Sequence, residues 1–186
     1  MANIVLFHSI LGLRPAEHEI ASRLEADGHA VTLPDLFGGQ TTETYDEGFA
    51  LKGRIGDELI LKGALKALDK APDSAVLAGI SFGAFLVGQL WGGRPKMKGA
   101  LLIAGVAPWT EHLRPGLPVQ AHISQPDQFD DEEFFEDWMA GAGQASCEMY
   151  RYTGVGHYFL DRSLPDFDVE ASEQCLRRAK RFLRGL

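Results

Sequence analysis

The chain has 186 residues, of which 45% are apolar and 24% are charged, values close to those of ordinary globular domains. This length and composition exclude disorder as the overall state and predict a single domain over residues 1–186. The formal net charge of −8 argues against a nucleic-acid partner, because an acidic surface repels phosphate backbones.

The cysteines and the apolar runs bear on location. Cys147 and Cys175 form no Cys-x-x-Cys pair, which argues against a disulfide scaffold or a zinc finger and fits a reducing cytosol. The first residues lack the basic segment of a secretory signal, and no apolar run approaches the roughly 18 residues of a membrane span. We therefore expect a cytoplasmic protein with no membrane partner.

Short apolar runs alternate with longer helical patterns along the chain. In chain order, the predicted elements are a strand at 4–7, a helix at 15–27, a strand at 30–33, a loop at 37–50, a helix at 55–71, a strand at 75–78, a helix at 81–91, strands at 100–103 and 119–123, a helix at 129–139, a strand at 148–152 and a helix at 169–183. This alternation predicts an α/β fold, with a mostly parallel sheet of about six strands and helices on both faces.

The clearest chemical motif is Gly79-Ile80-Ser81-Phe82-Gly83, which stands between a predicted strand and a predicted helix. It matches the G-x-S-x-G pattern of a nucleophile elbow, in which a serine occupies a sharp, strained turn. The two glycines leave room for neighbouring chain segments, and the following helix directs its first N–H groups at the site. Ser81 is therefore the predicted nucleophile. The alternative is a tight strand–helix turn that carries a serine by chance.

A nucleophilic serine needs a base, and the base needs an orienting carboxylate. In proteins with this elbow, the three follow in the order serine, acid, histidine. His157 follows the last predicted strand, and Asp127 is the first carboxylate after the preceding strand. Asp130 and Asp131 are alternative acids, although their positions favour capping of the next helix. We predict the triad Ser81, Asp127 and His157.

The chain resembles the dienelactone hydrolase family of α/β-hydrolases. The resemblance lies in LPDLFGG at residues 33–39, the elbow, PVQAH at 118–122 and YTGVGHYF at 152–159. It extends over nearly the whole chain, and the segment around His157 is the most distinctive. It implies an α/β-hydrolase fold and an acyl-enzyme hydrolase with the same three residues as the triad.

The chain also departs from the enzymes that give this family its name. Their nucleophile is a cysteine, whereas the elbow here carries Ser81. Ser9 matches the position of their gating glutamate, and Asp161, beside Arg162, matches the arginine that holds their substrate carboxylate. These differences argue against dienelactone as the substrate and leave ester hydrolysis as the expected reaction.

The expected reaction is a two-step acyl transfer from a carboxylic ester, a lactone or a thioester. Ser81 would attack the carbonyl and His157 would take its proton, and water would release the acyl group, so no cofactor is required. The backbone N–H groups of Phe82 and Ile10 are the candidates for the oxyanion hole. An ordinary strand–helix loop is the alternative for the segment around Ile10.

Other residues have weaker claims. His8, Trp109 and Tyr158 are candidates for the substrate pocket, although core packing explains each about as well. Lys52 and Arg54 could bind an acidic substrate, but a solvated helix face explains them better. The scattered histidines lack the spacing of metal ligands and predict no metal site.

The expected partner is therefore a small-molecule ester or lactone. Two other functions remain possible for this fold. One is a non-catalytic binding protein that kept a serine at the elbow, against which the ordered triad argues. The other is an acyltransferase that passes the acyl group to an alcohol or a thiol. Neither phosphate-binding pattern, G-x-x-x-x-G-K-[ST] or G-x-G-x-x-G, occurs, which argues against a nucleotide-binding domain.

Overall fold

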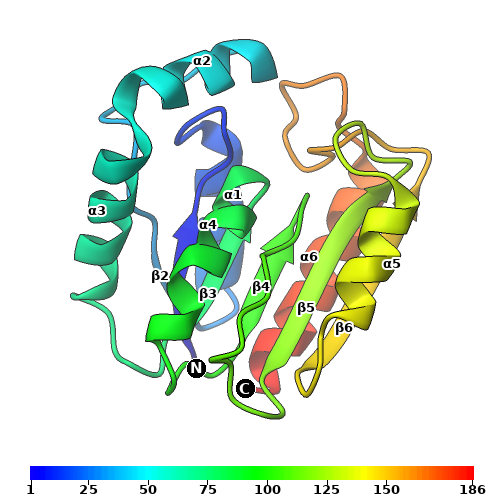
Figure 1. The fold of residues 1–186 in the computed structure, drawn as a ribbon. Helices are drawn as coiled ribbons and strands as arrows, with labels where there is room; N and C mark the ends of the chain where they lie inside the picture. The colour runs from blue at the N-terminus through cyan, green and yellow to red at the C-terminus, as the bar shows by residue number, and fades with distance from the viewer.

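The computed structural model describes all 186 residues, and its strands form one six-stranded sheet (Figure 1). The strands are β1 (Asn3–Phe7), β2 (Ala30–Thr32), β3 (Val76–Ile80), β4 (Ala100–Ile103), β5 (Pro118–Gln125) and β6 (Ser146–Thr153). They lie in the order β2-β1-β3-β4-β5-β6, and each neighbouring pair is parallel. The predicted α/β fold with a parallel sheet is confirmed.

Helices cover both faces of this sheet. They are α1 (Pro15–Glu25), α2 (Tyr45–Ile55), α3 (Asp57–Leu68), α4 (Phe82–Leu90), α5 (Glu132–Ala140) and α6 (Val169–Arg184), with a short 3₁₀ turn at Trp91–Gly93. Figure 1 shows α1 and α6 together on one face and α3 and α4 on the other. Arg23 of α1 pairs with both carboxylate oxygens of Glu173 of α6, at 2.5 and 2.7 Å. Outside residues 37–71, each end of a predicted element lies within three residues of the end observed in the structure.

The exception lies between β2 and β3. The loop predicted at 37–50 is wrong in its second half, because α2 begins at Tyr45. The Thr44 side chain accepts the Glu47 N–H, and the Glu47 carboxylate accepts the Thr44 N–H, which is a capping box. Gly56, at φ +88°, then ends α2, so the helix predicted at 55–71 is the second of two. Figure 1 shows α2 across the carboxyl ends of the strands.

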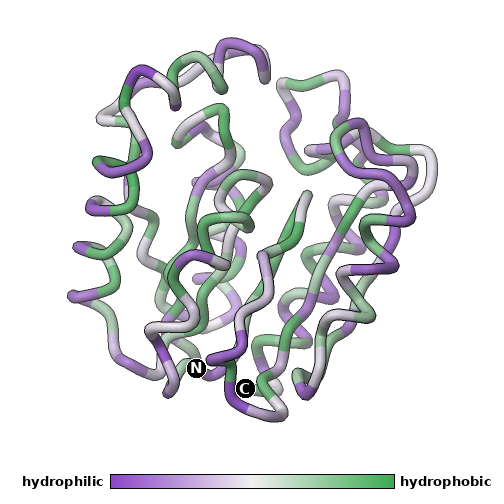
Figure 2. The backbone as a smooth tube through the Cα atoms, viewed as in Figure 1, coloured by the Kyte–Doolittle hydropathy of each residue, from purple (hydrophilic) through white to green (hydrophobic).

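The core lies on both sides of the central strands. Every residue of β3 and β4 is buried, because helices cover both faces of the sheet there. Figure 2 shows this as hydrophobic colouring along the central strands, with alternating colours along the outer helices α3 and α5. None of the helices combines the length and the apolar character that crossing a bilayer requires. The parallel arrangement directs the loops that follow the strands to one edge of the sheet.

Candidate active site

Ser81 lies at the turn between β3 and α4 and has φ +52°, a conformation that residues with a Cβ rarely adopt. Its N–H donates to the Ile103 carbonyl at 2.8 Å. The two glycines of the motif are required by close backbone approaches. A Cβ on Gly79 would lie 2.1 Å from the Gly83 carbonyl oxygen, and one on Gly83 would lie 2.2 Å from that of Phe7. The motif therefore produces the sharp turn that an exposed nucleophile needs.

The structure brings the three predicted triad residues together. His157 lies in the loop after β6, and its Nε2 is 2.8 Å from Ser81 Oγ. Its Nδ1 is 2.7 Å from Asp127 Oδ2, on the loop after β5. The His157 and Asp127 side chains are 4% and 1% exposed, so little water competes for these hydrogen bonds.

Asp127 is held by several donors. Its Oδ2 also accepts the Ser124 hydroxyl at 2.5 Å, and its Oδ1 accepts the Phe129 N–H at 2.9 Å. Burial raises the pKa of this carboxyl, but hydrogen bonds from His157, Ser124 and the Phe129 N–H, with the His157 charge, together outweigh burial and lower the pKa overall. Asp127 is therefore ionised near neutral pH and can orient the imidazole.

The two alternative acids occupy other positions. Asp131 caps α5, because its carboxylate accepts the Phe134 N–H at 2.8 Å. Asp130 lines the cavity beside Ser81, and burial and then the charge of Asp127 raise its pKa. Neither residue bonds a nitrogen of His157, so the geometry favours Asp127.

Two backbone N–H groups have no acceptor in the helix or loop that contains them. The Phe82 N–H is the first of α4, where no preceding turn supplies a carbonyl. Ile10 follows β1 and lines the same cavity as Ser81, and nothing in the protein accepts its N–H. The neighbouring Ser9 is held by Glu17, whose Oε1 accepts the Ser9 hydroxyl at 2.8 Å and its N–H at 3.3 Å. Both N–H groups are thus free to donate to a bound substrate.

Ser81 and His157 both line a cavity of about 530 Å³. Most of the residues that line it are apolar, and six of them are aromatic: Phe49, Phe82, Phe85, Phe129, Phe134 and Trp138. Four of these phenylalanines are exposed to the extent of 44–50%, which is unusual for so large an apolar side chain. A half-exposed aromatic rim around a nucleophile is suited to an apolar ligand.

His8, predicted for the pocket, lies in the core instead. It is fully buried, and its Nε2 accepts the Leu36 N–H at 3.1 Å while its Nδ1 lies 2.7 Å from the Ser9 carbonyl oxygen. Burial lowers its pKa, which favours the neutral imidazole. His8 lies at a strand end, as predicted, but its side chain bonds the backbone at Leu36 instead of reaching the cavity.

Trp109 and Tyr158 also lie outside the cavity. The Trp109 ring stacks between Trp91 and Trp138, with centroids 5.2 and 4.6 Å away, and its Nε1 donates to the Trp138 carbonyl at 2.7 Å. Tyr158 is fully buried, although His157 before it reaches the cavity. Proximity in sequence to a site residue therefore did not determine the direction of the side chain.

The cavity residues that sequence reasoning missed lie mainly on α2 and near α5. Lys52, expected on a solvated helix face, lines the cavity, where its Nζ is 2.5 Å from Asp57 Oδ1 and 5.8 Å from the centre of the Phe82 ring. The Thr-x-x-Glu signal at residues 44–47 could have revealed α2, and with it the contribution of Phe49 and Lys52. No group of three or more histidine, cysteine or acidic side chains is placed to hold a metal ion.

Solved structures of other proteins share this fold. A dienelactone hydrolase-like promiscuous phosphotriesterase, P91, from metagenomic libraries has a TM-score of 0.79 at 18% identity, with 100% of this chain and 87% of that chain covered. A cold-adapted esterase from an Arctic intertidal metagenomic library has 0.66 at 14% identity, with coverage of 97% and 82%. A thioesterase domain from the curacin biosynthetic pathway has 0.67 at 16% identity, with coverage of 98% and 88%. At these identities the likeness shows the α/β-hydrolase fold alone.

The family follows from the sequence. The profile of the dienelactone hydrolase family matches residues 1–186, so the chain belongs to the dienelactone hydrolase family. No curated protein matches the chain.

Proposed function

We propose that this protein is a serine hydrolase that cleaves carboxylic esters, lactones or thioesters through an acyl-enzyme. The supporting observation is the unbroken path from Ser81 Oγ to His157 Nε2, at 2.8 Å, and from His157 Nδ1 to Asp127 Oδ2, at 2.7 Å. A hydroxyl in such a path can lose its proton to the imidazole as it attacks a carbonyl. Membership of the dienelactone hydrolase family supports hydrolase activity.

The first step of the proposed mechanism forms the acyl-enzyme. Ser81 Oγ bonds to the carbonyl carbon, and His157 takes the hydroxyl proton and then gives it to the departing alkoxide or thiolate. Asp127 holds the imidazole in the required tautomer. The N–H groups of Phe82 and Ile10 donate to the oxyanion, and each such donor contributes roughly 3–4 kcal/mol to the transition state.

The second step releases the acid. Water gives a proton to His157 and attacks the acyl-enzyme, and the Ser81 oxygen leaves with that proton. Product analysis with and without an added alcohol or thiol separates this hydrolysis from acyl transfer to another acceptor. The unpaired cysteines, Cys147 and Cys175, support our proposal of a cytoplasmic location.

We further propose that the substrate presents an uncharged apolar group to the cavity. The wall is mostly apolar, and of its two charged side chains Lys52 is already paired with Asp57. The other is Asp130, whose raised pKa reflects the cost of burying its charge. An aryl or medium-length alkyl group gains more from this wall than a carboxylate does.

A panel of p-nitrophenyl esters tests this function. Wild type should hydrolyse the acetate, and its kcat/KM should rise by about tenfold or more for the hexanoate and the phenylacetate, because burying the larger group contributes roughly 1.5–3 kcal/mol. The hemisuccinate should be the poorest substrate. Ser81→Ala should be inactive on all four esters. Failure of wild type on every ester, or equal activity of Ser81→Ala, would refute the proposal.

A further inference from the structure

We propose that Tyr45, the first residue of α2, is a positioning residue that holds the imidazole of His157 in place. This inference rests on the proposed function, because it assigns His157 the role of base. Tyr45 lies 112 positions before His157 in the chain but beside it in the fold, where their ring centroids are 5.8 Å apart. The sequence pattern predicts a loop at this position and assigns Tyr45 no role.

The Tyr45 ring contacts the imidazole directly. The two rings meet edge to face, with an angle of 82° between their planes. Phe129 stands against the same imidazole at 4.6 Å and 81°, and the Tyr45 and Phe129 rings are 5.2 Å apart. Two aromatic rings at fixed angles limit the rotation of the imidazole, which must keep Nδ1 toward Asp127 and Nε2 toward Ser81.

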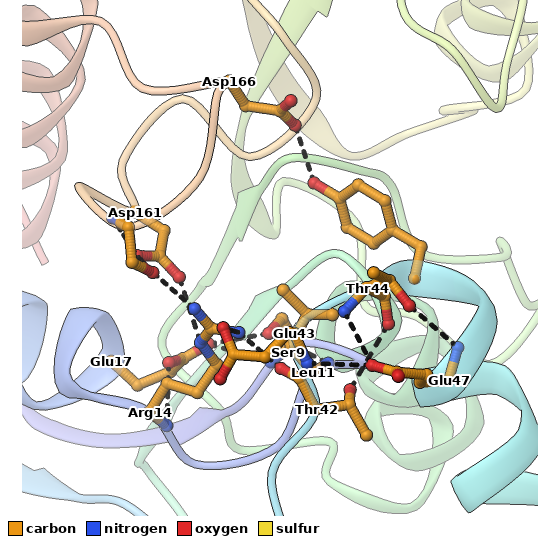
Figure 3. Close-up of polar contacts among 12 residues, drawn as sticks. Ser9, Leu11, Arg14, Glu17, Thr42, Glu43, Thr44, Glu47, Asp161 and Asp166 are labelled. Atoms are coloured by element: carbon orange, nitrogen blue, oxygen red, sulfur yellow. Dashed lines mark hydrogen bonds and ion pairs between the residues drawn. The ribbon is translucent and has the colours of Figure 1, made fainter.

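The Tyr45 hydroxyl supports the backbone of His157 through Asp166. It donates to Asp166 Oδ2 at 2.7 Å, the contact drawn to the labelled Asp166 in Figure 3. The same oxygen accepts the Tyr158 N–H at 3.0 Å. Burial, followed by the Asp166 hydrogen bond, raises the pKa of Tyr45, so its hydroxyl keeps the proton that it donates. The peptide bond that follows His157 is therefore tied to α2.

Gly156 makes this approach possible. A Cβ at this position would lie 2.6 Å from the carboxyl carbon of Asp166 and 2.7 Å from its Cα. Only glycine lets the Asp166 backbone and side chain pack this closely beside the peptide that precedes His157. Gly156, in the segment at 152–159 that resembles the family, is therefore needed for Asp166 to reach the backbone beside His157.

Arg14 links the loop at 157–166, which contains His157, to the residues before α2. Arg14 is 5% exposed, and its guanidinium forms an ion pair with Asp161, with Nε 3.2 Å from Oδ2 (Figure 3). It also donates to the Ser163 hydroxyl and to the Thr42 carbonyl. The loop at 157–166 and the segment at 42–45 are therefore linked at two points, one through Arg14 and one through Tyr45. A shift of α2 would carry His157 with it.

The test compares Tyr45→Phe, Asp166→Ala and the double variant in steady-state kinetics on the best ester of the panel. Titration with a fluorophosphonate gives the concentration of active sites, so that kcat refers only to folded, competent enzyme. Tyr45→Phe keeps the ring and should lower kcat about fivefold with KM changed less than twofold, the effect of one lost hydrogen bond on the geometry of the base. The double variant should be no slower than Asp166→Ala, because the hydroxyl acts through that carboxylate.

Two further variants complete the design. Tyr150→Phe is the matched control, because the Tyr150 hydroxyl also donates to a carboxylate, Glu148 at 3.3 Å, but its ring contacts His122 and not His157, so its kcat should not change. Gly156→Ala displaces Asp166 while leaving Tyr45 intact and should lower kcat as Tyr45→Phe does, which provides a second route if one variant folds poorly.

The outcomes separate this inference from the proposed function. Unchanged kcat in Tyr45→Phe, or losses that simply multiply in the double variant, would overturn the positioning role while leaving an active serine hydrolase. A wild type that reacts with neither fluorophosphonate nor esters would overturn the proposed function, and this inference with it. A fall in melting temperature without a fall in kcat per active site would show that Tyr45 is merely structural.

Discussion

At the scale of single residues, the candidate site depends on a strained serine, Ser81, and on the hydrogen-bonded pair of His157 and Asp127 beside it. Ser81 has φ +52°, a conformation that costs on the order of 1–3 kcal/mol and is kept only where the surroundings enforce it. The enforcement comes from Gly79 and Gly83, where any Cβ would meet backbone atoms. The strain exposes the hydroxyl to His157, which Asp127 in turn orients.

Substitution of the acid tests the assignment within this site. Asp127→Asn should lower kcat by about 10³–10⁴-fold with little change in KM, because the amide favours the wrong imidazole tautomer. Asp130→Asn, at a cavity position that does not bond His157, should change kcat by less than about tenfold. Steady-state kinetics of the two variants checks both expectations. The reverse result, with Asp130→Asn inactive and Asp127→Asn active, would reassign the acid.

The catalytic side chains could be predicted from the sequence because the elbow motif specifies both the residue type and its place in the fold. The elbow pattern and the chain order of serine, acid and histidine were enough to name three side chains that the structure brings within hydrogen-bond distance. Pocket residues were not predictable in this way. His8 stands at the expected strand end, but its ring bonds the Leu36 N–H, a partner 28 residues away that no local pattern reveals.

At the scale of elements, α2 is the part of the fold that shapes the site and that periodicity did not predict. Only Gly48 and Leu51 of this helix are buried, so it lacks the strong apolar stripe that marks a helix in sequence. Its start is instead encoded by the Thr44–Glu47 capping box and its end by Gly56. The helix exists because caps satisfy its ends and because Tyr45 and Phe49 pack toward the residues around His157.

Two glycines in helices allow a matched test of how these elements pack. Gly83→Ala places a Cβ 2.2 Å from the Phe7 carbonyl oxygen, at the crossing of α4 and β1. This variant should lower the free energy of unfolding by at least about 3 kcal/mol. Gly53→Ala, in α2, meets nothing within 4 Å and should raise it by about 0.5–1 kcal/mol.

Urea unfolding followed by circular dichroism measures both changes. Because both variants add one methyl group to a helix, the difference between them isolates the close approach at the elbow. Equal stability of the two variants would mean that α4 and β1 can separate without cost, which contradicts the close approach of Gly83 to Phe7.

At the scale of the whole molecule, the parallel sheet gathers distant residues at one edge. The loops after β1, β3, β5 and β6 supply Ile10, Ser81, Asp127 and His157, in that order. Alternation of strands and helices in the sequence was sufficient to predict this gathering, because the strands of a βαβ fold end at the same edge. The strand order itself depends on long-range packing and was not readable.

The buried His122 predicts how the stability of the whole fold varies with pH. Burial lowers its pKa from 6.5 to about 3, and its ring nitrogens lie 2.8 Å from the Tyr152 hydroxyl and 2.9 Å from Gln120 Oε1. Between these two pKa values the unfolded chain binds a proton that the folded chain does not. Stability should therefore fall as the pH falls below 6.5, by about 1.4 kcal/mol per pH unit for one such group.

Urea titrations at pH 7.5 and 5.5 check this dependence. His122→Gln removes the titrating group, so its free energy of unfolding should change less between the two pH values than that of wild type, by about 1 kcal/mol. His18→Gln, at an exposed position on α1, is the control and should keep the wild-type dependence. The same slope in His122→Gln as in wild type would show that His122 does not supply the acid sensitivity.

The nucleophilicity of Ser81 is measured by the mass of the protein after reaction with a fluorophosphonate, followed by peptide mapping. One adduct should form per chain, on the peptide that contains Ser81, and both Ser81→Ala and His157→Ala should fail to acquire it at a comparable rate. The reaction needs only a hydroxyl made nucleophilic by its neighbours, whatever the natural ester. A wild-type protein that stays unmodified, or an adduct on any other residue, would contradict the account.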